Sequence, residues 1–327
     1  MQITLKSPKE GDTVVLLTEK HLEYIKAPDN ASCEAVDWLN LTDGGQDLSL
    51  PEPCRFAFDP PADGEIAVWN EENEEERYTV PARAGEGELF NLRIGAHYAW
   101  QVRTESGVSP VGHFVTDPTA PRMLRVEGIS NVRDFGGFAC AGGRVKQGMI
   151  YRTSEMDRHV AIEPRGRETM YALGMRTDLD IRGAGEEPHP VLDPERVAYV
   201  NIPLAAYDAV FTPEQMECYR RTYLLLTRPS VYPLFIHCWG GIDRTGTWLY
   251  ILGALLGMSE EDLGLDYEMS SFSRWGKRSR NSAQFRAFLD VFRTMGATLK
   301  EAAENYLTQA GVPREDLEAI REILIEK

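Results

Sequence analysis

Cys238 and Arg244 are the two residues whose types and spacing first suggest chemistry. They stand six positions apart in the string HCWGGIDRTG, residues 237 to 246. A cysteine in a loop that opens a helix has its thiolate stabilised by backbone N–H groups and by the positive end of the helix dipole. The same donors suit a phosphate, and Gly240 and Gly241 let them converge without a clash from a Cβ atom. The string therefore predicts a nucleophilic cysteine at an anion site.

Three further residues of this string have expected roles. The planar guanidinium of Arg244 is able to grip two phosphate oxygens at once. Thr245 is able to hydrogen-bond the cysteine sulfur and to help it leave in a second step, and we expect His237 to orient the loop rather than to transfer a proton. A bare Cys-x5-Arg spacing is weak in a chain with five cysteines, so the specificity lies in the full string between two apolar segments.

The leaving group of a phosphate ester needs a proton, and two aspartates are candidates for the donor. Asp243 lies inside the loop, where a bound phosphate dianion would favour the protonated form of a carboxyl group, while the neighbouring Arg244 acts in the opposite direction. Asp180 ends another expected strand, where it either donates the proton or caps the next turn. We favour Asp243 and keep Asp180 as the alternative.

The elements that must position this loop are those of an α/β fold with a central, mainly parallel sheet flanked by helices. YPLFIHC, residues 232 to 238, is typical of a buried parallel strand, and TGTWLYILGALLG, residues 245 to 257, of a helix that is apolar nearly all round. We expect another strand in residues 176 to 183. A third segment predicts a helix with Thr212 as N-cap and Gln215 closing a capping box. The loop then lies where a strand ends and a helix begins, which is where α/β folds bind ligands.

The first third of the chain has a different pattern, with short apolar or alternating runs separated by Gly, Pro, Asp and Asn. This pattern predicts an all-β, antiparallel sandwich over residues 1–118. DPTAPR, residues 117 to 122, is typical of a linker. We therefore expect two domains, with all the chemistry in residues 119–327 and with that second domain able to fold alone.

Charge and cysteine usage limit the partners and the compartment. Up to Asp117 the chain has 9 Lys and Arg against 22 Asp and Glu, within a formal net charge of −16 for the whole. Such a surplus disfavours nucleic acid and anionic membranes as partners. The five scattered cysteines, with no signal peptide or membrane span recognised, favour a reducing, cytoplasmic location and no metal cluster. The one basic cluster, SRWGKRSRN at residues 273 to 281, is either a solvated face or a rim that attracts anionic substrate.

The string from residue 237 to 246 resembles the His-Cys-x5-Arg-Ser/Thr signature of cysteine-dependent tyrosine phosphatases, and in particular the atypical bacterial tyrosine-phosphatase family. The resemblance covers about residues 123 to 327. In the first domain, residues 92 to 117 resemble the last two strands of fibronectin type III-like domains. Further segments similar to the phosphatase family are NVRDFGG, IYRTSEM, DLDIRG, LDYEMSS and the C-terminal YLTQAGVPREDLEAIREIL.

The phosphatase resemblance implies that Cys238 forms a phosphocysteine intermediate and that Arg244 binds the phosphate, with no cofactor and no metal. The implied substrate is a phosphorylated protein or a small phosphomonoester, most simply a phosphotyrosine-like one. Ile242 departs from the family, whose members often carry Lys there, and this loss disfavours a phosphoinositide or other multiply phosphorylated substrate. Trp239, beside the cysteine, is expected to shape the pocket rim. The residues expected to supply phosphate-binding amides are Trp239, Gly240, Gly241, Ile242 and Asp243.

The sequence leaves undecided the roles of three supporting residues and the choice among three functions. Arg133, Asp134 and Arg152 either staple the loops around the site or contact substrate, and we favour stapling. The chain is an active tyrosine-type phosphatase, an inositol-phosphate or phosphoinositide phosphatase, or a silent phosphate-recognition module. The intact Cys238 and Arg244 favour an enzyme, because a binding module needs no cysteine.

Overall fold

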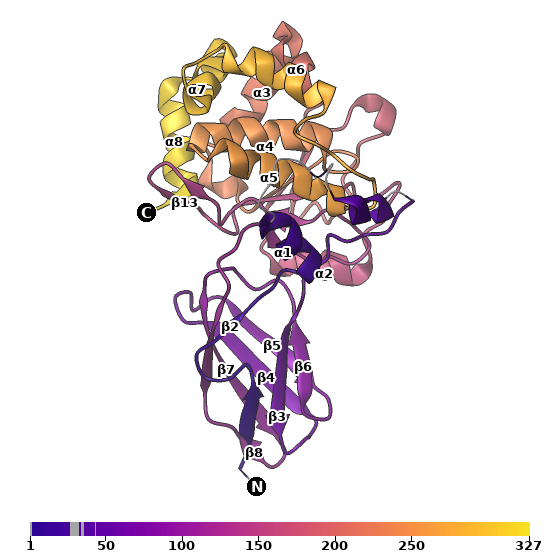
Figure 1. Ribbon diagram of the computed structural model, residues 1–327, viewed down its shortest axis with the longest axis vertical. Helices are drawn as coiled ribbons and strands as arrows, with labels where there is room; N and C mark the ends of the chain where they lie inside the picture. Colours follow the sequence, from indigo (N-terminus) through magenta and orange to yellow (C-terminus); the bar gives the residue numbers. More distant parts are fainter. Residues whose placement is uncertain (1, 27–32, 34–35, 43) are drawn as a thin grey trace. The chain divides into compact units, whose positions relative to one another are not determined.

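The structure is a computed structural model in which the chain forms two compact units (Figure 1). The division differs from the expected one, because residues 23 to 50, which the sequence places in the sandwich, belong with the α/β unit. The chain therefore passes between the units three times. The first unit comprises Met1–Leu22 and Pro51–Arg125, and the second comprises Glu23–Leu50 and Val126–Lys327. The described residues are 2–26, 33, 36–42 and 44–327.

The first unit contains two sheets whose inward side chains form one apolar core. Phe56 packs against Trp100 with ring centroids 5.0 Å apart and against Phe114 at 6.0 Å, so aromatic side chains from both sheets meet. The sequence predicted antiparallel strands here, and the pairs are antiparallel except that of β2 with β9, which is parallel. The strands of the first sheet are, in order, β1 (Thr4–Ser7), β3 (Cys54–Asp59) and β6 (Glu86–Leu89). The strands of the second sheet are, in order, β2 (Asp12–Val14), β9 (Gly112–Thr116), β7 (His97–Thr104), β4 (Gly64–Asn70) and β5 (Arg77–Ala82), and β8 (Gly107–Val108) pairs with β7.

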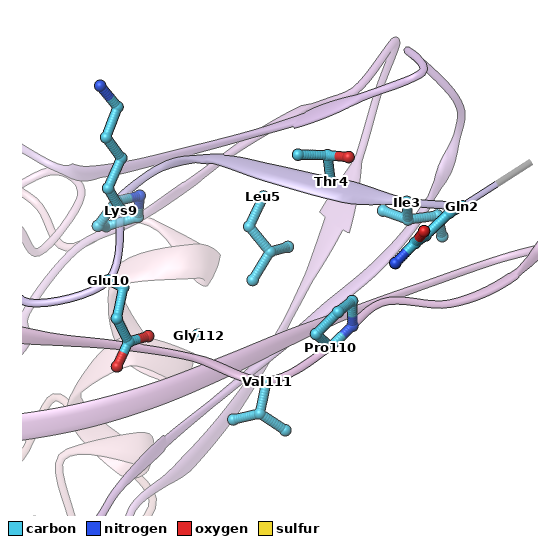
Figure 2. Close-up of a pocket in the computed structure, with 10 residues that line it drawn as sticks. Gln2, Ile3, Thr4, Leu5, Lys9, Glu10, Pro110, Val111 and Gly112 are labelled. Carbon is cyan, nitrogen blue, oxygen red and sulfur yellow. The ribbon is translucent and has the colours of Figure 1, made fainter.

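A cavity of about 250 Å³ lies within the first unit, beside β1 and the start of β9 (Figure 2). Its lining is mostly apolar or aliphatic, with one lysine and one glutamate. No cysteine, histidine or arginine lines it, so it offers no group for the chemistry suggested by the sequence. The lining residues are Gln2, Ile3, Thr4, Leu5, Pro8, Lys9, Glu10, Pro110, Val111 and Gly112.

The second unit is built on a mixed sheet that is mainly parallel. Its strands run in the order β11 (Arg133–Asp134), β14 (Ile150–Thr153), β17 (Leu234–His237), β15 (Thr177–Asp180) and β16 (Ala198–Asn201). β14, β17, β15 and β16 are mutually parallel, and β11 is antiparallel to β14. Thr153 and Asp180 both lie opposite His237 in register, so three strands end together immediately before Cys238.

Helix α4 (Asp243–Leu256) follows this sheet edge and is buried from Thr245 to Leu256. It contacts α5 (Glu260–Glu268), α7 (Leu299–Gln309) and α8 (Arg314–Leu324) (Figure 1). Because its flanks are covered, the apolar residues all round it are satisfied. The other elements are α1 (Glu19–Lys26), α2 (Pro164–Ala172), α3 (Pro213–Leu225), α6 (Ala283–Arg293), η2 (Asp37–Thr42), η3 (Ala184–Glu186), η4 (Tyr207–Phe211), η5 (Pro229–Val231), η6 (Met269–Phe272), β10 (Arg122–Met123), β12 (Ala139–Cys140), β13 (Gly143–Val145) and β18 (Ile325–Glu326).

The start of α3 shows which local prediction was right and which was wrong. Thr212 is the N-cap and accepts a hydrogen bond from the amide of Gln215 at 3.4 Å, as expected. The capping box is wrong, because the Gln215 side chain accepts instead from the amide of Ala205 at 2.7 Å. The helix thus uses Gln215 to hold the chain that precedes it. No helix in the described part of the chain is long and apolar enough to cross a membrane.

Candidate active site

Cys238 lies at the carboxyl end of β17, where the three strands end, and shortly before α4. Cys238 is 3% exposed, and Arg244 from the first turn of α4 lies close enough for the cysteine to affect its pKa. Burial alone would lower the pKa of Arg244, but the hydrogen bonds to Glu186 and the neighbouring Cys238 raise it well above its usual range. Arg244 is therefore a permanent cation next to the cysteine sulfur.

The carbonyl groups of the loop between Cys238 and α4 are held by two buried side chains. The Asn131 amide donates to the carbonyl oxygens of Gly240 and Gly241, each at 3.0 Å. Arg152 donates to the carbonyl oxygen of Gly241 at 2.6 Å. Because Asn131 and Arg152 hold the carbonyl oxygens on one side of the loop, the N–H groups of the loop point away from these two side chains.

None of the N–H groups of Trp239, Gly240, Gly241 and Ile242 donates to another described residue. Gly241 has φ +64°, and a Cβ atom there would lie 2.0 Å from the carbonyl oxygen of Thr153, so only glycine fits. Unpaired amides ahead of a helix N-terminus form an anion-binding concavity. The loop therefore offers unpaired amides ahead of α4, and phosphate binding by them stays a prediction.

A buried ionic cluster fixes the side chains behind the loop. Asp266 accepts from Arg133 at 2.9 Å and from Arg152 at 2.5 Å, and all three residues are at most 3% exposed. Burial alone would raise the pKa of Asp266, but the two arginines lower it. Asp134 accepts from the amides of Gly136 and Gly148. These are the contacts of residues that staple the loops.

His237 is buried beneath the loop with a carboxylate beside it. Its Nε2 lies 3.1 Å from Asp178 and 4.0 Å from Asp180, and its Nδ1 lies 3.1 Å from the carbonyl oxygen of Cys238. Burial alone would lower the pKa of His237, but the two carboxylates raise it to about 9. A protonated His237 donates from Nδ1 to the carbonyl oxygen of Cys238 and forms an ion pair with Asp178 at Nε2, and so joins the start of the loop to the sheet.

Glu186 forms a bidentate ion pair with Arg244 that the sequence did not reveal. Its two carboxylate oxygens accept from Nη1 and Nη2 at 2.6 and 2.7 Å. Glu186 is itself held by the amide of Gly183 at 3.0 Å, and its pKa is lowered mainly by the Arg244 hydrogen bonds. This pair occupies one edge of the guanidinium and leaves the edge that carries Nε for other acceptors.

Asp180 is poorly placed to donate a proton. It is fully buried, and its carboxylate accepts from Arg182 at 2.8 to 3.1 Å and from Tyr199 at 3.0 Å. Burial alone would raise the pKa of Asp180, but His237 and Arg182 lower it. Asp180 also accepts from the amide of Arg182 at 2.9 Å, which is the contact of a residue that caps the next turn, the alternative that the sequence left open.

Asp243 is the more accessible of the two aspartates, with a side chain that is 36% exposed. Its Oδ1 accepts from Arg278 Nε at 3.0 Å and from the hydroxyl of Tyr207, which has φ +58°. Arg278 belongs to the basic cluster, and Trp275 of the same segment lies against Gly240. Residues 273 to 281 therefore border the loop, which is the rim alternative for this cluster.

The remaining residues of the string lie around the sulfur. Trp239 is 44% exposed and packs against His159, with ring centroids 4.2 Å apart. Ile242 is buried, so its side chain presents no group to a ligand. The hydroxyl of Thr245 is buried and has no partner among the described residues, so it is free to reach the sulfur.

Comparison with known proteins identifies a family for the part of the chain that contains this site. The model of the tyrosine phosphatase family matches residues 124–326. The chain belongs to that family. This phosphatase is 30% identical over 224 residues to a protein of Cupriavidus necator named "Putative tyrosine-protein phosphatase", a match that covers 58% of the chain and 81% of the relative.

Among solved structures, the phosphatase is similar to the core catalytic domain of the PP-IP phosphatase SIW14 from S. cerevisiae in complex with citrate. That likeness has 18% identity and a TM-score of 0.30, and covers 38% of this chain and 71% of the other. It is too weak to carry an argument about fold or substrate. Among the described residues, no group of three or more His, Cys, Asp or Glu is arranged to hold a metal ion.

The sequence did not predict which carboxylates form ion pairs with the arginines of the site. Glu186 and Asp266 are carboxylates whose importance depends on arginines distant in the chain. Asn131 stood in a quoted segment, NVRDFGG, and its φ of +61° is a conformation that asparagine tolerates. That segment was the available signal for Asn131, whereas nothing in the local pattern pointed to Glu186.

Proposed function

We propose that this phosphatase hydrolyses phosphomonoesters through a phosphocysteine intermediate on Cys238. The observation that carries the proposal is the loop of unpaired amides that begins directly after Cys238 and ends at Arg244. Such a cradle fits the oxygens of a phosphoryl group, and its donors are fixed before substrate arrives. A nucleophile and an anion site at one point are what phosphoryl transfer to a thiolate needs.

In the first step, the Cys238 thiolate attacks phosphorus, the S–P bond forms and the bond from phosphorus to the leaving oxygen breaks. The leaving oxygen takes a proton from Asp243. Tyr207 and Arg278 both engage Oδ1 of Asp243, so the transferable proton is assigned to Oδ2, which accepts no hydrogen bond from another described residue. Arg244 and the loop amides hold the other phosphoryl oxygens.

In the second step, a water molecule attacks the phosphocysteine and the S–P bond breaks. Asp243 takes the proton from that water, and inorganic phosphate leaves. The hydroxyl of Thr245 donates to the departing sulfur, a role that its lack of another partner supports. His237 holds the first carbonyl of the loop in place throughout.

The surroundings of the sulfur favour phosphotyrosine-like substrates. Trp239 presents an exposed ring next to the cysteine, and Ile242 supplies no cation where a second phosphate would need one. An aryl group gains from aromatic contact. The inositol-phosphate alternative keeps one supporting observation, since Arg274 and Lys277 belong to the same segment as Trp275 and Arg278 and form no ion pair with another described residue.

The nucleophile is tested with Cys238→Ser. We expect the purified variant to lose turnover of p-nitrophenyl phosphate while binding inorganic phosphate much as the parent does, because the amides and Arg244 remain. Mass spectrometry of acid-quenched parent should find phosphate on the peptide that contains Cys238. Hydrolysis by the serine variant near the parent rate would refute the proposal.

The substrate class is tested with a panel assayed side by side. It comprises a phosphotyrosine peptide, a phosphoserine peptide, an inositol hexakisphosphate solution and vesicles that contain phosphoinositides. We expect the highest kcat/KM on the phosphotyrosine peptide. A higher value on the inositol phosphate or on the vesicles would replace the aryl preference with the alternative, and Trp239→Ala would then leave the ranking unchanged.

A further inference from the structure

Residues Glu23–Leu50, which we call the excursion, lie outside the segment that matches the family model. They nonetheless pack within the α/β unit and reach two parts of the active site. Ser49 contacts the segment that holds the loop, and a second group of contacts reaches residues 268 to 278. The excursion is therefore more than a connection between the units.

The first contact leads directly to the phosphate-binding loop. The amide of Asn131 donates to Ser49 Oγ at 3.1 Å, and the Ser49 hydroxyl donates onward to Asp47 at 2.6 Å. Both Ser49 and Asn131 are at most 1% exposed. Since the Asn131 side chain holds the carbonyls of Gly240 and Gly241, Ser49 lies one residue away from the loop itself.

The second group of contacts fixes the segment that borders the loop. Leu48 donates from its amide to the carbonyl of Phe272 at 2.7 Å, and the Cys33 thiol donates to the carbonyl of Arg278 at 2.8 Å. Tyr24 donates to Glu268 at 2.5 Å. The side chain of Arg278 in turn pairs with Asp243, so the excursion also supports the residue next to the proposed acid.

We propose that the excursion positions the active site, with Ser49 as a positioning residue that acts through Asn131. Asn131 has φ +61°, an uncommon backbone conformation. This one conformation sets the direction of both its backbone amide and its side chain. The bond to Ser49 Oγ satisfies that amide in the interior. Without it, a buried N–H group is left unpaired and the side chain that holds Gly240 and Gly241 loses its fixed base.

Three variants of the full chain test this inference, which rests on the proposed function. Ser49→Ala removes the acceptor, and Ser49→Thr restores a hydroxyl. The matched control is Thr42→Val, because Thr42 is also fully buried in the excursion and its hydroxyl donates only within it, to the carbonyl of Leu39 at 2.7 Å. Each variant is measured for kcat and KM on p-nitrophenyl phosphate, for inhibition by inorganic phosphate, and for Tm.

We expect Ser49→Ala to lower kcat/KM about tenfold, which is about 1.4 kcal/mol, and to weaken inhibition by inorganic phosphate by a similar factor. Thr42→Val should lower Tm comparably, since it also loses one buried hydrogen bond, yet keep the parent kinetics. Ser49→Thr should recover most of the lost activity. Should Ser49→Ala fail to fold, Ser49→Cys takes its place, because a thiol fills the space but accepts a hydrogen bond weakly.

Two results would overturn the inference. One is that Ser49→Ala and Thr42→Val lower Tm equally and both retain parent kinetics, which makes Ser49 merely structural. The other is that Ser49→Thr remains as impaired as Ser49→Ala. Failure of the proposed function is distinct from both, because the parent itself would then show no turnover that depends on Cys238.

Discussion

Asp178→Asn should remove the part of the unfolding free energy that depends on the protonation of His237. Asp178 lies 3.1 Å from His237 Nε2, and the two residues are 2% and 1% exposed. The folded-state pKa of His237 is raised from 6.5 to about 9, so folding favours the protonated imidazole. The stabilisation is therefore fully present below pH 6.5, declines as the pH rises, and is lost above about pH 9.

The size of the effect follows from these two values. A folded-state pKa of about 9 against 6.5 in the unfolded chain is worth about 3 kcal/mol, because each pKa unit corresponds to about 1.36 kcal/mol. Solvent screening is small at a pair this deeply buried. We expect the parent to lose about 3 kcal/mol of unfolding free energy between pH 6 and 9.5 through this pair, and Asp178→Asn to lose far less.

The assay is urea unfolding followed by circular dichroism at intervals from pH 6 to 9.5. The matched control is His113→Gln, because His113 forms a surface pair with Glu71 at 3.0 Å and is half exposed. That variant should follow the parent profile, whereas His237→Gln should flatten it as Asp178→Asn does. A parent profile that is flat over this range, or one that Asp178→Asn follows in parallel, would refute the reasoning.

Four further variants probe the chemistry. Arg244→Lys should lower kcat about a hundredfold or more, measured on p-nitrophenyl phosphate, because a point charge does not reproduce the planar fork; near-parent kinetics would make Arg244 structural only. Asp243→Asn should lose more on an aryl phosphate whose leaving group has a high pKa than on one with a low pKa, whereas Asp180→Asn should slow both equally, and the reverse pattern would exchange the roles. Glu186→Gln should lower kcat/KM about tenfold through a misplaced Arg244, since hydrogen bonds to charged groups are worth about 1.5–3 kcal/mol. A rise in kcat/KM would instead mean that Glu186 competes with the phosphate.

The sequence predicted the parts of the site that depend on local pattern. The apolar run before Cys238 formed a buried strand, and the apolar run after Thr245 formed a central helix. Both follow from burial on all sides, which leaves a clear signal in the residues themselves. The loop between them needed Gly241 for its backbone conformation, and that requirement is also local.

The parts that were not predicted depend on pairing between distant segments. The sequence placed residues 23 to 50 in the sandwich, but several of their described members contact residues more than 80 positions away, as Ser49 does Asn131. The expectation that residues 119–327 fold alone omitted this segment. Likewise, Glu186 has no distinctive local context, and its role depends on Arg244, which lies 58 positions later.

The charge balance around the loop explains how an acidic chain provides an anion site. The chain has a net charge of −16, and four of the carboxylates around the loop show how this charge is offset. Each is paired with a cation at hydrogen-bonding distance, so their fields largely cancel at short range. The amides of Trp239 to Ile242 have no partner among the described residues, and the Nε edge of Arg244 is not used by Glu186. On the proposed function, phosphate binding is thus governed by the local pairing and not by the net charge. The four pairs are Glu186 with Arg244, Asp243 with Arg278, Asp178 with His237, and Asp180 with Arg182.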